Sequence, residues 1–391
     1  MKETRFKQTE IGLIPEDWDI TYIEKECKVG TGSKNTQDKE ESGKYPFYVR
    51  SEKIERINTY SYNCEAVLTA GDGVGTGKVF HYVNGKFEVH QRVYIINEFS
   101  DKLDGLFFYL YFSNNFLERI KTMTAKSSVD SVRKDMINKM QIPLPLLYEQ
   151  KKIASALISI DNLLLSLDKL IEKKKFIKQG AMQELLTGKK RLPGFTGEWE
   201  SSNLGELCII KDGTHQTPKY VENGIPFYSV ENVTNNNFKT AKNITLKDHN
   251  LLTKNYRIEK GDVLMTRIGS IGICKYIDWE VNASFYVSLA LLKFKDKSLA
   301  RFFSFYSRTE GFIKEIESKS LQFATPKKIN LSNISLVKIE YPISKEEQEM
   351  IISTLSSMDR EIESLEGKKA KYEQIKQGMM QQLLTGKIRL I

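Results

Sequence analysis

The chain has 391 residues, which is too long for one ordinary hydrophobic core and fits two domains with connecting segments. Its hydrophobic content of 40% is enough to fill packed interiors and excludes general disorder. The 59 Lys and Arg residues outnumber the 50 Asp and Glu residues, and the resulting net charge of +9 favours a polyanionic partner such as nucleic acid without proving one.

Cysteine usage and hydropathy indicate a reduced, cytoplasmic protein. The cysteines form no C-x-x-C pair, which disfavours a zinc ribbon, a redox dithiol and a disulfide framework. The longest apolar stretch is Leu106–Phe112, far short of the roughly 18 residues of a membrane helix. The segment before Trp18 lacks the apolar core of a signal peptide.

Residues 1–147 are predicted to form a first globule of mixed α/β structure, with a strand over Arg92–Ile96 and a helix over Asp104–Lys121. Its loop GDGVGTGK resembles a phosphate-binding loop but fails on spacing. Five residues separate Gly71 from Gly77, and a valine follows Lys78. We therefore expect tight turns between strands in this loop.

Residues 148–192 are predicted to form a long helix. Apolar side chains recur in alternating steps of four and three residues, at Ile153, Leu157, Ile160, Leu164, Leu167 and Ile171. This period of 3.5 residues is typical of a coiled-coil seam, which a second helix has to cover. The helix contains no proline and runs into the stop signal Thr187-Gly188.

Residues 193–344 are predicted to form a second globule that is weakly related to the first. Trp199, Cys208 and Gly213 repeat the spacing of Trp18, Cys27 and Gly32, and a Pro-Phe-Tyr triplet occurs once in each globule. The segment DVLMTRIGSIGICK parallels the glycine-rich loop of the first globule but loses most of its glycines. We expect a strand over Phe285–Leu292 and a helix over Leu299–Glu317.

Residues 345–391 repeat the long helix. Between Glu149–Leu192 and Glu347–Leu390, 23 of 44 aligned positions are identical, where unrelated stretches would share roughly three. The second seam comprises Ile351, Leu355, Met358, Ile362, Leu365 and Tyr372. Helices of about 36 residues would each be about 55 Å long, and we expect them to pack antiparallel because a large segment lies between them. The Leu-Leu-Thr-Gly end of each helix is expected to cap the helix and to dock partner subunits.

The fold class is therefore mixed α/β (α+β): two globules and two long helices that form an antiparallel coiled coil, with a pseudo-two-fold internal repeat. No catalytic signature accompanies it. The four histidines, His81, His90, His215 and His249, stand in no metal-binding or triad spacing, and no Asn-Pro-Pro-Tyr-type methylation motif is present. Catalysis by this chain alone is not expected.

Four motifs, in the right order over the whole chain, resemble the specificity (S) subunits of type I restriction–modification enzymes. TEIGLIPEDW at Thr9–Trp18 and RLPGFTGEWESSNLGEL at Arg191–Leu207 are similar to the openings of that family's two target-recognition domains. The paired IKQG…LLTGK…RL segments at Ile177–Leu192 and Ile375–Leu390 resemble its two conserved helical regions.

The resemblance implies a non-catalytic subunit that binds double-stranded DNA. Each recognition domain would read one half of a bipartite, asymmetric site, while the helices would set the spacing and dock the methylase subunits. It further implies two methylase (M) subunits, forming an adenine-N6 methyltransferase, and two restriction (R) motor subunits. S-adenosylmethionine, ATP and Mg²⁺ would belong to those partners, with no cofactor or metal on this chain.

DNA contacts are expected from basic and amide side chains in the predicted loops. Arg, Asn and Gln form hydrogen bonds with base edges, while Lys and Ser mostly contact phosphate. The candidates in the first globule are Arg50, Lys78, His90, Gln91, Arg92, Lys126, Ser127, Arg133 and Lys134. Those in the second are His215, Lys219, Asn232, Arg267, Lys275, Lys327 and Lys328. Two alternatives stay open: a coiled-coil scaffold that binds protein partners, and a DNA methyltransferase or nuclease with an unrecognised active site.

Overall fold

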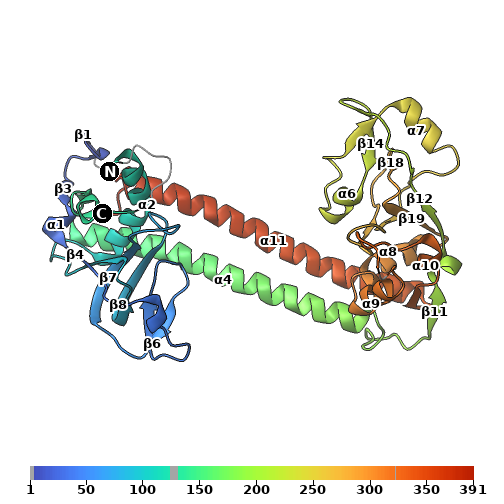
Figure 1. Cartoon of the computed structure of the whole chain (residues 1–391), viewed down its shortest axis with the longest axis horizontal. Helices are drawn as coiled ribbons and strands as arrows, with labels where there is room; N and C mark the ends of the chain where they lie inside the picture. Colours follow the sequence, from blue (N-terminus) through green and yellow to red (C-terminus); the bar gives the residue numbers. More distant parts are fainter. Residues whose placement is uncertain (1–3, 124–130, 322) are drawn as a thin grey trace. The chain divides into compact units, whose positions relative to one another are not determined.

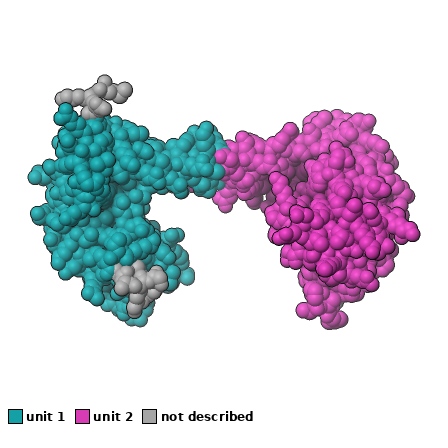
Figure 2. Space-filling view, turned by 90° about the horizontal axis from the view of Figure 1, so that it is seen from above, with its two compact units in different colours: residues 1–168, 368–391 teal, residues 169–367 magenta. Residues whose placement is uncertain are grey.

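The computed structural model describes residues 4–123, 131–321 and 323–391 (Figure 1). By its contacts the chain divides into two compact units (Figure 2). Unit 1 comprises residues 1–168 and 368–391, and unit 2 comprises residues 169–367. Each unit therefore contains one globule and a part of both long helices, whereas the four segments predicted from the sequence follow one another along the chain.

The globule of unit 1 is built on a six-stranded sheet in the order β4-β9-β7-β8-β5-β6. All neighbours pair antiparallel except β5 and β8, which are parallel. The strands are β4 (Lys28–Thr31), β5 (Tyr45–Tyr48), β6 (Glu55–Ile57), β7 (Tyr62–Ala70), β8 (Phe80–Val89) and β9 (Val93–Asn97). The strand predicted over Arg92–Ile96 is β9, and the glycine-rich loop is the turn between β7 and β8, as predicted.

Helix α2 (Gly105–Met123) packs an aromatic row into the core of unit 1. Phe108, Phe112 and Phe116 follow one another at i, i+4 spacing, with successive ring centroids 5.3 and 4.4 Å apart. The helix begins at Asp104, whose carboxylate accepts a hydrogen bond from Phe107 N at 2.9 Å. It confirms the helix predicted over Asp104–Lys121. Short helices, η1 (Thr36–Asp38) and α3 (Lys134–Asn138), lie in the loops.

The globule of unit 2 divides the corresponding strands between two four-stranded sheets, β12-β19-β16-β17 and β13-β15-β14-β18. Their bounds are β12 (Cys208–Asp212), β13 (Tyr220–Val221), β14 (Ile225–Tyr228), β15 (Lys242–Ile244), β16 (Val263–Thr266), β17 (Cys274–Tyr276), β18 (Ser284–Phe285) and β19 (Leu289–Phe294). The long strand β8 of unit 1 thus corresponds to two short strands, β17 and β18. The residues between them pack into a separate small core around Ile277 and Ala283.

Two elements of unit 2 differ from the sequence prediction. The single strand predicted over Phe285–Leu292 is wrong, because a turn at residues 286–288 separates β18 from β19, with Leu289 N donating to Tyr286 O at 2.9 Å. The helix predicted over Leu299–Glu317 is two helices, α8 (Lys297–Tyr306) and α9 (Glu310–Ser318). The break arises because the Thr309 side chain caps α9 by accepting a hydrogen bond from Phe312 N. Helices α6 (Val230–Thr234), α7 (Leu246–Leu252) and α10 (Leu331–Ser335) complete this globule.

A two-stranded ladder joins the start and the end of each globule. In unit 1, β3 (Asp19–Tyr22) pairs antiparallel with β10 (Gln141–Leu144), and β1 (Phe6–Thr9) pairs with β2 (Gly12–Pro15). In unit 2, β11 (Trp199–Asn203) pairs antiparallel with β20 (Lys338–Pro342). The short helices α1 (Ile23–Glu26) and α5 (Leu204–Leu207) follow β3 and β11. Each ladder places the first strands of a globule beside the start of the long helix that follows it.

The two long helices, α4 (Leu147–Leu185) and α11 (Lys345–Leu383), have 39 residues each. Every predicted seam side chain is buried or half-buried. At the start of each helix, however, the seam faces a globule as well as a helix. Ile153 and Leu157 belong to the core of unit 1, and Ile351 and Leu355 belong to the core of unit 2. None of the helices in the described ranges has the length and apolar character of a bilayer-spanning segment.

Ion pairs fix the antiparallel direction of the helices within each unit. In unit 1, α4 supplies the acids and α11 the bases: Asp161–Lys376 at 2.5 Å and Asp168–Lys369 at 2.6 Å. In unit 2 the roles reverse, with Lys174–Glu361 at 2.7 Å, Lys175–Glu366 at 2.6 Å and the pair Lys178–Asp359. Each helix supplies its acids ahead of its bases, so a parallel arrangement would bring like charges together. The predicted antiparallel pairing is confirmed.

Each Leu-Leu-Thr-Gly segment caps its helix. Gly188 and Gly386 both have φ +68°, the left-handed conformation that ends many helices. The leucines before them are buried in the core of their own unit, in unit 2 for α4 and in unit 1 for α11. Capping is confirmed, and the leucine side chains pack against this chain itself.

Just beyond each cap, an arginine binds the glutamate at the start of the other helix. Arg389 donates from Nε and Nη2 to the Glu149 carboxylate at 2.7 and 2.9 Å. Arg191 donates in the same way to Glu347 at 2.6 and 2.7 Å. Each pair lies within a single unit, Arg389–Glu149 in unit 1 and Arg191–Glu347 in unit 2. Both carboxylates are almost completely buried. We call them the unit 1 latch (Arg389–Glu149) and the unit 2 latch (Arg191–Glu347).

Candidate nucleic-acid interface

Several loops of unit 1 meet beyond the ends of its strands and are joined by backbone hydrogen bonds. Gln91 N donates to Lys34 O at 2.8 Å, and His90 N donates to Tyr48 O at 3.0 Å. Gly71 N donates to Arg92 O at 2.9 Å, while Val132 N donates to Gly71 O at 2.7 Å. We call this set, formed by residues 32–35, 49–51, 71–79, 90–92 and 131–133, the unit 1 loop cluster. It brings segments distant in sequence onto one frame.

Two arginines of this cluster share one carboxylate. Arg50 Nη1 lies 2.7 Å from Asp72 Oδ1, and Arg92 Nη1 lies 2.6 Å from Asp72 Oδ2. Partial burial would raise the pKa of Asp72, but the hydrogen bonds from the two guanidinium groups outweigh it and hold that pKa below its usual value. The arginine side chains remain 42% and 60% exposed. The cluster therefore presents two oriented cations to solvent.

The neighbouring candidates His90 and Gln91 play different parts. His90 is buried, and its Nδ1 accepts a hydrogen bond from Arg92 N at 3.0 Å. Burial and the positive charge of Arg50 lower the pKa of His90, so the ring is neutral near pH 7 and holds the turn. Gln91 is exposed and donates to Asn35 Oδ1 at 2.5 Å.

The other described candidates of unit 1 are basic residues in the cluster or next to it. Lys78 ends the turn after Gly77, and Arg133 and Lys134 follow Val132 at the start of α3; all three are exposed. Lys126 and Ser127 lie outside the described residues.

Unit 2 repeats the same backbone frame with different side chains. Val287 N donates to Thr214 O at 3.0 Å, and Tyr286 N donates to Tyr228 O at 3.0 Å. Arg267 N donates to Ser288 O at 2.9 Å, and Ile329 N donates to Arg267 O at 3.0 Å. Each bond has its counterpart in unit 1. We call the corresponding set, residues 212–216, 229–232, 267–273, 286–288 and 327–329, the unit 2 loop cluster.

This correspondence pairs three positions of the unit 1 loop cluster with positions in unit 2. Arg92 corresponds to Ser288 because both carbonyls accept the same bond. Asp72 corresponds to Ile268, since the isolated bridges Asp72–Ser131 and Ile268–Lys328 are equivalent. The matched triplets Pro46–Tyr48 and Pro226–Tyr228 place Val230 at the position of Arg50. The two arginines and their carboxylate therefore have no charged counterparts at these three positions in unit 2.

Two of the residues predicted to contact DNA in unit 2 hold the fold together. Arg267 is 5% exposed, and its guanidinium donates to the carbonyls of Ile329 at 3.3 Å and Val287 at 3.1 Å. Asn232 is 6% exposed, and its amide bonds to Ser229 and to Asn237 O close the start of α6. Neither side chain is presented to solvent, because each satisfies buried backbone groups, and we omit both from the interface proposed below.

The remaining candidates of unit 2 are more accessible. His215 is exposed and lies 2.9 Å from Asp212 Oδ2, and Lys219 is exposed on the same loop. Lys275 is half-buried over the Trp279 ring, and burial lowers its pKa. Lys327 is exposed near Glu317 at 3.1 Å, and Lys328 is half-buried beside Ile268.

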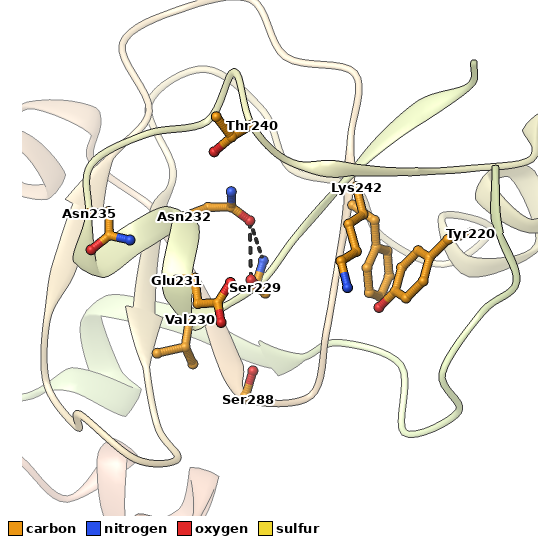
Figure 3. A pocket seen from close by; sticks show the side chains of 10 residues that line it. Tyr220, Ser229, Val230, Glu231, Asn232, Asn235, Thr240, Lys242 and Ser288 are labelled. Carbon is orange, nitrogen blue, oxygen red and sulfur yellow. Dashed lines mark hydrogen bonds between the residues drawn. The ribbon is translucent and has the colours of Figure 1, made fainter. Parts of the chain in front are cut away.

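A pocket of about 420 Å³ opens at the unit 2 loop cluster (Figure 3). On one side the ammonium of Lys242 lies 4.8 Å from the centre of the Tyr220 ring. On the other side lie residues of α6, including Val230 and Glu231, with the Ser288 hydroxyl nearby. The residues at the positions of Arg50 and Arg92 thus line a polar hollow in unit 2.

Several of these residues were not found from the sequence. Asp72 is not predicted from the sequence, because an acidic residue is not expected on a surface that binds DNA, although its place between two glycines indicates a turn. Tyr220 and Lys242 lie on neighbouring strands, β13 and β15, whose pairing is not visible in the sequence. The sequence feature that could have indicated these two residues is the combination of exposed aromatic and basic side chains in short polar strands.

Among the residues with described positions, no cluster of three or more His, Cys, Asp or Glu side chains is arranged to hold a metal ion. The loop clusters instead offer oriented hydrogen-bond donors on rigid backbone frames, an arrangement suited to binding.

The family described as the type I restriction modification DNA specificity domain matches residues 15–178 and 196–374. The two matches coincide with the two halves of the internal repeat. This chain belongs to that family. The predicted family resemblance is confirmed, and so is the mixed fold with two globules and two long helices.

Relatives and solved structures agree with the assignment. The chain is 29% identical over 420 residues to the type I restriction enzyme MjaVIII specificity subunit of Methanocaldococcus jannaschii, covering 100% of this chain and 97% of that one. It is 26% identical over 196 residues to the EcoDI specificity subunit of Escherichia coli, covering 49% and 42%. The S subunit from M. genitalium has the same fold, with a TM-score of 0.62 and 18% identity over 97% of this chain and 98% of that one. The HsdS subunit from Thermoanaerobacter tengcongensis superimposes with a TM-score of 0.51 and 15% identity, over 96% and 98%.

Proposed function

We propose that this chain acts in the cytoplasm as the specificity subunit of a type I restriction–modification complex, in which each unit reads one half of a bipartite, asymmetric DNA site. The observation that carries the proposal is the pair of loop clusters. They share a backbone frame bond for bond but differ in the side chains they present. A common backbone frame that carries different side chains suits the recognition of two different half-sites, because side chains recognise the DNA sequence by contacts with base edges.

The charge of the chain supports DNA as the ligand. Phosphate contacts by Lys and Arg supply much of the affinity for DNA, and the +9 net charge provides them. Exposed Lys78, Arg133 and Lys327 belong to the clusters, and exposed Lys219 lies close to the unit 2 loop cluster in sequence. They would contact the DNA phosphates beside the bases that are read.

The chain would rely on partners for chemistry. Two methylase subunits would dock on the two near-equivalent surfaces made by the repeat, because a pseudo-two-fold scaffold presents similar sites twice. They would methylate adenine at N6 with S-adenosylmethionine. Two motor subunits, which use ATP and Mg²⁺, would complete the restriction complex. The long helices would set the gap between half-sites.

The test is co-expression of this chain with the methylase subunit of its own system in a host free of DNA methylation, followed by mapping of modified adenines through long-read sequencing. A single split, asymmetric motif is expected. A complex that can be purified but modifies no motif would contradict the proposal and favour a scaffold for protein partners.

Binding by the purified complex provides an independent check. Affinity for duplexes that carry the mapped motif should fall steeply with added salt, because each neutralised phosphate releases counterions. Equal affinity for motif and scrambled duplexes at physiological salt would contradict a role in sequence recognition. Stoichiometric binding of S-adenosylmethionine to this chain alone would point instead to a methyltransferase.

A further inference from the structure

At three positions of the shared backbone frame, the unit 1 loop cluster carries charged side chains where the unit 2 loop cluster carries uncharged ones. Arg50 and Arg92 come from different loops, yet both are held by the two oxygens of Asp72. On the equivalent frame of unit 2, the three positions carry Val230, Ser288 and Ile268. The backbone is thus constant while the charge pattern changes, which is expected where the side chains determine specificity.

The remaining donor groups of the two arginines are free to meet a ligand. Each guanidinium uses only Nη1 toward Asp72, and within the described ranges no further hydrogen bond engages either head group. Each also keeps about half of its side chain in solvent. A guanidinium fixed through one nitrogen still offers a planar pair of N–H donors. Such a pair matches the O6 and N7 acceptors of guanine in the major groove.

Building on the proposed function, we propose that Arg50 and Arg92 read guanine in the half-site bound by unit 1, and that Asp72 is the positioning residue that orients both. Fixing the two guanidinium groups in advance reduces the conformational entropy lost on binding. The half-site bound by unit 2 is read without an arginine at the corresponding positions, by the polar pocket around Ser288 and Glu231.

An alternative role for the two arginines is phosphate binding, and the two roles respond differently to lysine. Lysine keeps the charge that grips phosphate but loses the planar pair of donors that matches guanine. The test is therefore the R50K/R92K double variant, which also keeps cations beside Asp72 and so preserves the fold. Its methylated motif is mapped beside that of the parent complex.

In the parent motif, one half-site should contain guanine, and the double variant should accept other bases at that position. The other half-site and the spacer should not change. The control is K28A, an exposed lysine on β4 opposite Asn97, the last residue of β9. It should leave this guanine requirement intact. A double variant that keeps the motif unaltered, or a parent motif without guanine in either half, overturns the inference.

Binding to duplexes with 7-deazaguanine, which lacks the N7 acceptor, gives a second readout. Replacing the recognised guanine should weaken binding by the parent complex about tenfold to a hundredfold and should not affect the double variant. D72N should reduce this discrimination while leaving the salt dependence of binding unchanged. If the double variant methylates no site at all, this assay decides, and equal binding to both duplexes by the parent complex overturns the inference. The parent complex modifying no motif would instead be a failure of the proposed function.

Discussion

In both units an arginine–glutamate pair, the latch, joins the end of one long helix to the start of the other, but the residues that surround the pair differ between the units. In unit 1, Glu149 also accepts a hydrogen bond from Trp18 Nε1 at 3.1 Å, and Arg389 also binds Asp17 through two bonds of 2.8 Å. In unit 2, the tryptophan at the equivalent place, Trp199, has a buried Nε1 with no hydrogen-bond partner among the described residues. The unit 1 latch is therefore the more fully satisfied of the two.

This difference shows which parts of a duplicated sequence are constrained. The latch residues align at the same offset as the helices, so both copies keep the ion pair. Their surroundings belong to the globules, which have diverged. The unit 1 latch takes its arginine from the segment that follows α11, whereas the unit 2 latch takes its arginine from the segment that follows α4. The following predictions compare the two latches, beginning with the largest expected effect.

Removing either latch arginine should be the most damaging change. R389A leaves the buried Glu149 carboxylate without its cation, and R191A does the same to Glu347, so each should cost about 3–5 kcal/mol. Hydrogen exchange of peptides from each unit measures the loss, which should appear in unit 1 for R389A and in unit 2 for R191A. K190A, beside Arg191 but largely exposed, is the control and should be neutral. Equal loosening of both units by one arginine variant would contradict the assignment.

Much of this organisation was predictable because the helical repeat is strongly patterned. The seam positions and the Thr-Gly stops follow from periodicity and from the identities between copies, and the antiparallel direction follows from the large segment between the two helices. What could not be predicted depends on loops that meet in space. Arg50 and Arg267 are both arginines in predicted loops. The Arg50 side chain pairs with Asp72 and is partly exposed to solvent, whereas the Arg267 guanidinium donates hydrogen bonds to backbone carbonyls inside the globule. Sequence position alone does not separate them.

The tryptophans offer a matched pair of substitutions. W18F and W199F remove the same volume and the same N–H group, but only Trp18 donates to a carboxylate. W18F should therefore cost about 1.5–3 kcal/mol more than W199F, the contribution of a hydrogen bond to a charged group. Denaturant unfolding monitored by hydrogen exchange in each unit gives the two values. Similar costs would mean that the Trp18–Glu149 bond contributes little to the unit 1 latch.

The capping glycines differ in how closely the globule approaches them. Both have φ +68°, so alanine is strained at either position. A Cβ at Gly386 would lie 2.5 Å from Pro15 Cγ, whereas one at Gly188 would lie 3.2 Å from the Trp199 ring. G386A should therefore be about 1–3 kcal/mol more destabilising than G188A, as overpacking usually is. The free energy of unfolding of each unit is measured for both variants by denaturant unfolding monitored by hydrogen exchange. If G188A is the more harmful variant, then the backbone strain outweighs the packing.

The smallest effect is expected from the helix ion pairs, where the two units should behave alike. Asp161–Lys376 and Lys178–Asp359 are equivalent under the internal repeat, and all four side chains are partly exposed. A double-mutant cycle at each pair should give a coupling of about 0.2–1 kcal/mol, the usual range for partly exposed pairs. The single reversal D161K should cost more than D161A because it places two lysines together, and adding K376D should recover the loss. If the recovery is complete in both units, then the charge order along the helices sets direction and adds little to stability. Coupling in one unit alone would show that divergence of the globules has reached the helices as well.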